Sequence, residues 1–364
     1  MKNIAIITWI NYPNYGTYLQ AYALQQYIKS LGYNCKILND KDYIASNFNW
    51  KFEIKKILWG LKEHYRNYRG SWNYSLSLYE SFKNKYLNIE NIVNDSDYLN
   101  KQYDAFVCGS DQIWNPFFLS NSQSKFYYAD FAYKRKIAYA PSIGVSEIPL
   151  QYKTIFKELT KNFEFLSSRE QQGVDALHEL TGKDASKVVD PTLLLNAEQW
   201  DMLLSSSEAC DESDYILAYF LTPNPNFIQM TLKYAIQRGL KLKIFYTDKS
   251  YYNYNCDLVS AGPIEFMFYI KNATCLFTDS FHGSIFASIF HTQFFTFKRF
   301  KQTARSQNSR VVNLLNMMGI SERLLDEDNC ETVYKLSDID FEQVDYNLAP
   351  LIKKSKEYIE KALQ

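Results

Sequence analysis

One histidine stands where a strand should end and a helix should begin. Residues 273–278 form a short apolar run, typical of a buried strand, and Asp279 and Ser280 follow, which both often cap helix N-termini. His282 is therefore predicted to lie on a strand-to-helix turn, where backbone N–H groups and the helix dipole favour a phosphate or carboxylate. Because imidazole titrates near neutral pH, His282 could also exchange protons. The alternative is a capped turn in which His282 only packs.

A second polar segment follows the predicted strand 104–108. Residues 109–116 combine turn formers with side chains that can bind a ligand. Asp111 could orient sugar hydroxyls, and the ring face of Trp114 could stack on a sugar. In the alternative, Asp111 caps a helix and Trp114 fills a core. The sequence leaves both interpretations open.

An arginine follows the predicted strand 163–167. The planar guanidinium of Arg169 can hold a carboxylate or a phosphate through two parallel hydrogen bonds. The alternative is an ion pair with Glu170 or Asp190. We interpret Asp190 and the proline after it as a rigid exit from a strand.

These segments need a scaffold that brings strand ends together. Strand 4–8, helix 16–28 and strand 34–38 form a strand–helix–strand unit, which implies a right-handed parallel crossover. Ligands of open parallel sheets bind beyond the carboxyl ends of the strands. Further strands are expected over residues 104–108, 136–140, 163–167, 215–221, 242–247, 273–278 and 293–297, and further helices over 171–180, 226–238, 264–272, 310–318 and 351–362.

Length and a polar linker predict two domains. A chain of 364 residues exceeds what one core usually organises, and residues 196–214 are mostly polar. We expect an α/β fold of two Rossmann-like domains. The first covers residues 1–195 and is joined by the C-terminal helix within 346–364, and the second covers 196–345 and carries the His282 turn.

Composition excludes some partners. Forty basic and forty acidic residues give a net charge of zero, so no overall field attracts nucleic acid. The aromatic fraction of 17% suits sugar binding, although core packing explains it equally well.

The cysteines indicate a reducing compartment. The six residues show no close pair and no zinc-ligand spacing, so we expect a cytoplasmic protein without a metal site. The apolar run at residues 4–8 is too short for a signal peptide, and we find no apolar window of about 18 residues that could span a bilayer.

Residues 51–69 predict a helix with a basic face and an aromatic-aliphatic face. Such a helix either packs on its domain as an ordinary surface helix or rests on the membrane, close to a lipid-linked acceptor. A membrane contact there would place the protein at the inner face of the membrane.

The order of the motifs along the chain resembles the polysaccharide pyruvyl transferase family. The resemblance covers roughly residues 4–320, and it rests on Asn14-Tyr15-Gly16 with Leu19-Gln20-Ala21, Gly109 to Asn115, Ser168-Arg169-Glu170, Asp190-Pro191 and Asp279 to Gly283. It implies two Rossmann-like domains that face each other across a cleft, as in GT-B glycosyltransferases. It also implies transfer of pyruvate from phosphoenolpyruvate, a co-substrate, onto two hydroxyls of a capsular or cell-surface sugar, or of a lipid-linked precursor, as a cyclic ketal.

The resemblance also implies roles for individual residues. Arg169 and His282 correspond to the family's residues for donor binding and catalysis, so Arg169→Ala and His282→Ala should abolish turnover and leave the fold intact. We add Asp111 as a second catalytic residue. The remaining donor-binding predictions are Ser280, Gly283 and Ser284, and the acceptor-binding predictions are Asn14, Tyr15, Gly16, Ser110, Gln112, Trp114 and Asn115.

The chain departs from the family pattern at Ser280, where some members carry an arginine. A donor cation is thus missing from its expected place. We expect its replacement among four basic residues shortly downstream, namely Lys298, Arg299, Arg305 and Arg310.

Two other functions fit the same sequence, because a fold does not determine its chemistry. One is a GT-B glycosyltransferase that uses a nucleotide sugar. The other is a non-catalytic, glycan-binding relative in which the arginine has been lost.

Overall fold

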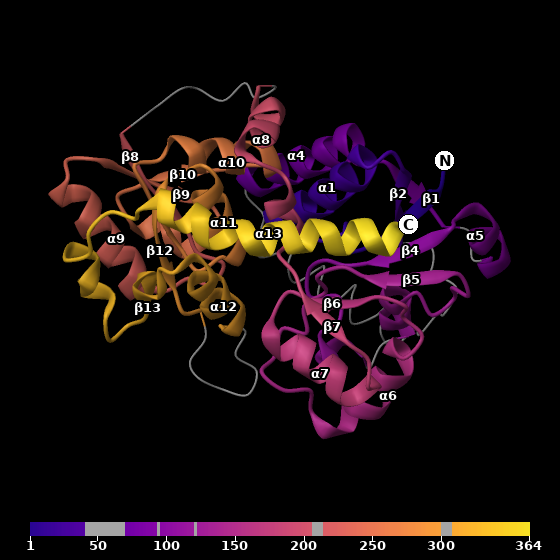
Figure 1. Cartoon of the computed structure of the whole chain (residues 1–364). Coiled ribbons are helices and arrows are strands. Elements are labelled where there is room, and N and C mark those ends of the chain that lie inside the picture. The colour runs from indigo at the N-terminus through magenta and orange to yellow at the C-terminus, as the bar shows by residue number, and fades with distance from the viewer. Residues whose placement is uncertain (41–69, 93–94, 120–121, 206–213, 300–307) are drawn as a thin grey trace. The chain divides into compact units, whose positions relative to one another are not determined.

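The computed structural model describes residues 1–40, 70–92, 95–119, 122–205, 214–299 and 308–364 (Figure 1). These residues form two compact units. The first comprises Met1–Pro191 and Ser355–Gln364, and the second comprises Thr192–Lys354. The sequence placed the corresponding boundaries at 195 and 346. The predicted basic helix at 51–69 lies outside the described residues.

The first unit is built on a parallel five-stranded sheet in the order β3-β2-β1-β4-β5. All four residues of β4 are buried, as expected for a parallel strand with helices on both faces of its sheet. A separate parallel pair, β6 and β7, follows, and an isolated bridge joins Ile137 of β5 to Phe165. The strands are β1 (Asn3–Ile7), β2 (Asn34–Asn39), β3 (Ile89–Asn91), β4 (Ala105–Cys108), β5 (Arg135–Ala138), β6 (Leu166–Ser168) and β7 (Ala185–Lys187).

Helices alternate with these strands. The α-helices are α1 (Tyr15–Ser30), α4 (Gly70–Tyr86), α5 (Ser96–Gln102), α6 (Leu150–Thr160) and α7 (Gln171–Thr181), and the short 3-10 segments are η1 (Pro116–Phe118) and η2 (Ser122–Tyr128).

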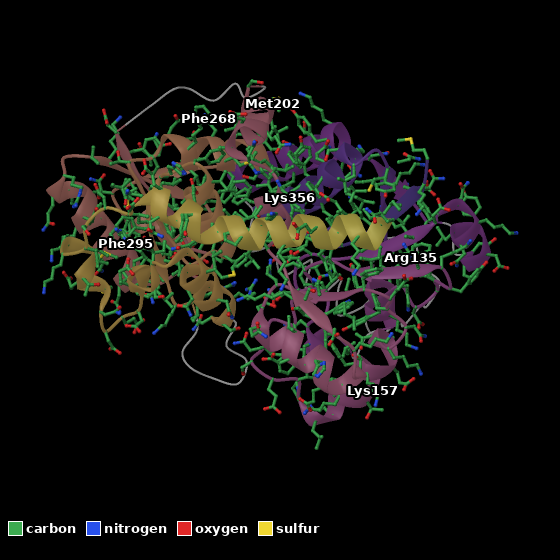
Figure 2. All side chains as sticks on the ribbon, in the orientation of Figure 1. Arg135, Lys157, Met202, Phe268, Phe295 and Lys356 are labelled. Carbon is green, nitrogen blue, oxygen red and sulfur yellow. The ribbon has the colours of Figure 1, made fainter. Side chains whose placement is uncertain are left out.

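The second unit is built on a parallel six-stranded sheet in the order β10-β9-β8-β11-β12-β13. Phe295 of β12, labelled in Figure 2, packs against Phe277 of β11 with ring centroids 5.1 Å apart. The strands are β8 (Tyr215–Tyr219), β9 (Lys241–Phe245), β10 (Asp257–Val259), β11 (Cys275–Thr278), β12 (Gln293–Phe297) and β13 (Leu324–Leu325). The helices are α8 (Ala197–Leu204), α9 (Pro225–Gln237), α10 (Pro263–Asn272), α11 (Phe281–Ile289) and α12 (Ser309–Met318), with 3-10 segments η3 (Pro191–Leu194), η4 (Lys249–Asn253), η5 (Ser321–Arg323) and η6 (Cys330–Tyr334).

The last helix, α13 (Phe341–Leu363), is the long yellow helix of Figure 1. It begins in the second unit, and its residues from Ser355 onward belong to the first. The predicted helix at 351–362 is therefore present but begins ten residues earlier than expected, since the observed helix starts at Phe341. Pro350 lies inside this helix, where proline is uncommon.

The α/β fold class is confirmed, since both main sheets are parallel and helices follow their strands. One strand is displaced: residues 163–167 were predicted, and β6 covers Leu166–Ser168. Among the helices in the described residues, we find none that is both long enough and apolar enough to cross a bilayer.

Candidate active site

The His282 turn has the predicted strand–turn–helix form. β11 ends at Thr278, and α11 begins at Phe281 with Ser280 as its N-cap. The hydroxyl of Ser280 accepts a hydrogen bond from the amide of Gly283 at 3.2 Å. A Cβ atom on Gly283 would lie 2.8 Å from Thr278 Oγ1, so the turn requires glycine there. His282, the second residue of α11, is only 6% exposed. Its ring is perpendicular to that of Phe281, and the two ring centroids are 5.2 Å apart.

The predicted donor residues of this turn use their hydrogen-bonding groups internally. The Ser280 amide donates to Thr278 Oγ1 at 3.0 Å, and the Ser284 amide donates to Ser280 O at 3.1 Å. The hydroxyl of Ser284 lies 2.7 Å from Thr296 Oγ1, which ties α11 to β12. Ser280, Gly283 and Ser284 therefore form the helix cap, and fewer amides point to an anion than the sequence suggested.

Asp279 links the turn to the loop after β8. Its carboxylate is 5% exposed and accepts from the amides of Leu221 at 2.6 Å and Thr222 at 3.1 Å. Burial raises the pKa of Asp279 to about 6, although these hydrogen bonds and the charge of Arg299 act in the opposite direction. In the sequence, Asp279 stood out as a helix-capping residue and as part of the family motif, and neither signal predicted this link between strands.

Arg299 reaches the same loop. It follows β12, and its Nε donates to Thr222 Oγ1 at 2.7 Å, while its amide donates to Asn308 Oδ1 at 3.2 Å. Arg299 thus bonds the loop that Asp279 holds. Nothing in the sequence marked Thr222 except its place after a strand.

The other candidate cations have different surroundings. Lys298 pairs with Asp326 at 2.8 Å, and this hydrogen bond lowers the pKa of Asp326. Arg310 stands in the first turn of α12 and is partly exposed. Arg305 lies outside the described residues.

In the first unit, the segment after β4 folds against α1. Asp111 has a φ of 64°, a left-handed conformation that is uncommon for a residue other than glycine. Its carboxylate accepts from Thr17 Oγ1 at 2.8 Å and from the amide of Gln112 at 2.8 Å. The buried residue Ser110 donates its amide to Gln20 Oε1 at 3.1 Å. Neither Thr17 nor Gln20 was predicted as a site residue, although Gln20 lies in a family motif and two polar residues three apart on an apolar helix are a usable signal.

Arg169 lies in a buried cluster of charges. It is 2% exposed, and it bonds Asp190 through Nη1 at 2.5 Å and Glu170 through Nε at 3.3 Å. Burial favours a lower pKa for the guanidinium, but the charges of Asp190, Glu170 and Asp111 outweigh it and hold the pKa above its ordinary value. The ion-pair alternative is therefore the arrangement present. Three carboxylates surround one guanidinium here, so the cluster is acidic.

Two further residues complete this cluster. Ser142 donates to Glu170 Oε1 at 2.7 Å, and Ser110 Oγ lies 3.3 Å from Asp190 Oδ2. Ser142 follows β5 and Asp190 follows β7, so the cluster collects residues from several strand ends, as the sequence predicted for such segments.

The prediction of Trp114 as a sugar platform is wrong. Its ring is fully buried and stacks on Tyr128, with centroids 5.1 Å apart and planes at 4°. The indole Nε1 donates to Tyr127 O at 3.0 Å. Trp114 therefore fills the core, which was the alternative interpretation.

The remaining acceptor predictions have local structural partners. Asn14 caps α1 by accepting from the amide of Thr17 at 3.3 Å, and Tyr15 is buried and stacks on Tyr79 of α4. Gly16 is also buried, in the first turn of α1. Asn115 caps η1, and its Nδ2 donates to Gln112 Oε1 at 3.3 Å.

Solved structures with similar folds are GT-B enzymes. UDP-GlcNAc 2-epimerase from Methanocaldococcus jannaschii superposes with a TM-score of 0.54 at 12% identity, covering 100% of this chain and 99% of that one. The Neisseria meningitidis UDP-GlcNAc 2-epimerase bound to UDP-GlcNAc gives 0.52 at 9% identity, covering 100% and 99%. At such identities the likeness establishes the fold alone, and this chain has the GT-B fold.

Sequence comparison identifies the family. None of the curated proteins shows significant sequence similarity to this chain. The family model for polysaccharide pyruvyl transferase matches residues 14–299, which is well over half of the 364 residues and includes both the acidic cluster and the His282 turn. The chain therefore belongs to the polysaccharide pyruvyl transferase family.

Proposed function

We propose that this protein transfers pyruvate from phosphoenolpyruvate to two hydroxyls of one sugar, as a cyclic ketal, in a capsular or cell-surface glycan or its precursor. The observation that carries the proposal is the turn between β11 and α11 in a chain of this family: His282 stands three residues after Asp279, and Asp279 bonds the loop that Arg299 reaches.

Arg299 supplies the donor cation in this proposal. Phosphoenolpyruvate carries a phosphate and a carboxylate, and an anion in a partly dry site needs charge-assisted hydrogen bonds. Arg299 follows β12, the strand next to β11, and it reaches the loop held by Asp279. Its position supports a replacement for the arginine that some family members carry where this chain has Ser280.

His282 serves as the acid and base. The donor methylene carbon takes a proton from imidazolium, a sugar hydroxyl attacks the central carbon, and the neutral imidazole receives the hydroxyl proton. Phosphate then leaves with the electron pair of its C–O bond, and the second hydroxyl closes the ketal and releases its proton.

The acidic cluster of the first unit suits the acceptor. Asp111, Glu170 and Asp190 outnumber Arg169, and a site with excess negative charge repels an anionic donor. Sugar hydroxyls, by contrast, donate hydrogen bonds to carboxylates. We therefore propose that Asp111 and its neighbours bind the hydroxyls of the acceptor sugar. In this proposal Arg169 holds the carboxylates in place and does not bind the donor.

The proposal includes a cytoplasmic site of action. The five described cysteines, Cys35, Cys108, Cys256, Cys275 and Cys330, are free thiols, which is the usual state in a reducing compartment.

The function is tested by incubating the protein with phosphoenolpyruvate and a panel of galactose and N-acetylmannosamine acceptors. We expect acceptor-dependent phosphate release and an acceptor that gains one pyruvyl group by mass spectrometry. Release of a nucleoside diphosphate from nucleotide sugars would instead identify a glycosyltransferase. Glycan binding without either product would identify a non-catalytic relative.

A further inference from the structure

The side chain of Arg299 crosses the end of the strand that carries the histidine turn. In the sheet, β11 lies between β8 and β12. Thr222 follows β8 and Arg299 follows β12, yet Arg299 Nε lies 2.7 Å from Thr222 Oγ1. Because neighbouring strands are about 4.8 Å apart, the two backbones are separated by roughly 10 Å, and only a long side chain lying across the end of β11 closes that gap.

Asp279 occupies the strand end that Arg299 crosses. Its two carboxylate oxygens accept from the amides of Leu221 and Thr222, so the residue after β11 holds the loop after β8 in place. The charge of Arg299 acts on Asp279, which agrees with a guanidinium lying above this position. Asp279, Thr222 and Arg299 therefore form one chain of contacts across three adjacent strands.

Both ends of this chain are anchored. On the β12 side, the amide of Arg299 donates to Asn308, which is 7% exposed. On the β8 side, Phe220 O accepts from Thr247 Oγ1 at 2.7 Å and from the hydroxyl of Tyr251 at 3.2 Å. The loop that presents Thr222 is thus held by its neighbours before any ligand arrives.

We propose that Thr222 and Asp279 are positioning residues that hold the Arg299 guanidinium across the end of β11, facing a donor anion at the His282 turn. The role of the anion rests on the function proposed above. An arginine side chain loses much rotamer freedom when it binds a ligand, and a hydroxyl that holds it beforehand removes part of that cost from binding. Thr222 then affects donor affinity and leaves the chemical step unchanged.

The kinetic test compares Thr222→Val with Thr222→Ser. Valine keeps the shape of threonine, and its backbone amide can still donate a hydrogen bond to Asp279. It lacks the hydroxyl that accepts a hydrogen bond from Arg299. We expect Thr222→Val to raise KM for phosphoenolpyruvate about fivefold, since it removes a solvent-exposed hydrogen bond to a charged group, and to keep kcat and the acceptor KM within about twofold. Thr222→Ser should return the donor KM to within about twofold of the wild type.

Thr292→Val is the matched control, because it removes a hydroxyl at the opposite end of β12 from Arg299, where Thr292 Oγ1 donates to Ile270 O at 2.8 Å. Its donor KM should stay close to the wild-type value. The proposal is overturned if Thr222→Val leaves the donor KM unchanged, or if it lowers kcat as much as it raises KM.

A second measurement needs no turnover, so it separates this inference from the proposed function. In a double-mutant cycle of Thr222→Val and Arg299→Met, melting temperatures should fall by less than the sum of the single effects. The pair Thr292→Val and Arg299→Met should be additive. Non-additive changes in melting temperature for Thr222→Val and Arg299→Met support the positioning role, whichever donor the protein uses. Additive changes for this pair overturn it.

Discussion

At the scale of single residues, the buried charges matter most. Arg169 holds Asp190, whose side chain is fully buried, and Glu170, which is 3% exposed. Removing one partner from such a group leaves an uncompensated charge in a medium that solvates it poorly. From the sequence we expect Arg169→Ala to leave the fold intact, but these buried ion pairs indicate a loss of stability.

We therefore predict that Arg169→Ala lowers the free energy of unfolding by about 3–5 kcal/mol. Lys161→Ala is the control, because its ion pair with Glu158 is about half exposed on both sides and should contribute at most about 1 kcal/mol. Urea unfolding of both variants measures the difference. An Arg169→Ala protein as stable as the wild type would show that the acidic cluster does not need its cation.

The raised pKa of Asp279 predicts that the stability of the protein falls as the pH rises. Its pKa is about 6 in the folded protein, against an ordinary value of 3.8. A carboxyl group with a raised pKa binds its proton more tightly in the folded state, so its stabilising effect is full below about pH 4 and is lost as the pH rises through 6. Relative to Asp279→Asn, the wild type should lose about 3 kcal/mol between pH 4 and 7.

Unfolding free energies of both proteins across this range test the prediction. Asp326→Asn is the control with opposite sign: Lys298 lowers the pKa of Asp326, so its contribution is lost as the pH falls. Parallel curves for the wild type and Asp279→Asn would contradict the expected titration.

At the scale of elements, the junction of β11 and α11 combines several local requirements. Ser280 caps the helix, and Thr278 Oγ1 accepts a hydrogen bond from the Ser280 amide. Gly283 leaves room for the Thr278 side chain. Each requirement is met by residues within six positions of one another, so local sequence can specify the whole element.

We predict that Ser280→Ala costs about 1 kcal/mol of stability, because the Gly283 amide loses its acceptor. Ser280→Thr should be closer to the wild type, since threonine also caps helices and adds no charge to this buried turn. Melting temperatures of the two variants check this. Equal losses in both would mean that the hydroxyl has a role other than capping.

At the scale of the whole molecule, residues far apart in the sequence complete the first unit. Ser355 Oγ accepts from the amide of Val189 at 2.9 Å, and the Tyr358 hydroxyl donates to Ala138 O at 2.8 Å. Glu360 accepts from the Tyr27 hydroxyl at 2.7 Å, and Ile359 is fully buried.

A chain that ends after Lys354 should therefore lose the stability of its first unit. Calorimetry should show a lower first-unit transition and a nearly unchanged second one, because the deleted residues belong to the first unit. Tyr358→Phe, which removes one hydrogen bond, should have a much smaller effect. Unchanged transitions after the deletion would contradict this assignment of the helix.

Much of the fold follows from local patterns. Apolar runs followed by capping residues predicted β1, β4, β8 and β11 to within a few residues, and the joint order of short motifs identified the family. The short edge strands β3, β10 and β13 went unpredicted, because two or three residues carry no periodicity that a sequence pattern can detect.

The sequence by itself determined that His282 stands on a strand-to-helix turn, since the strand, the cap and the helix are neighbours in the chain. Tertiary structure decided which groups meet there. Trp114 stacks in a core, Arg169 pairs with Asp190 from another strand end, and Arg299 reaches Thr222 across β11. These contacts depend on the order of strands in a sheet, which brings distant segments side by side and which no local pattern contains.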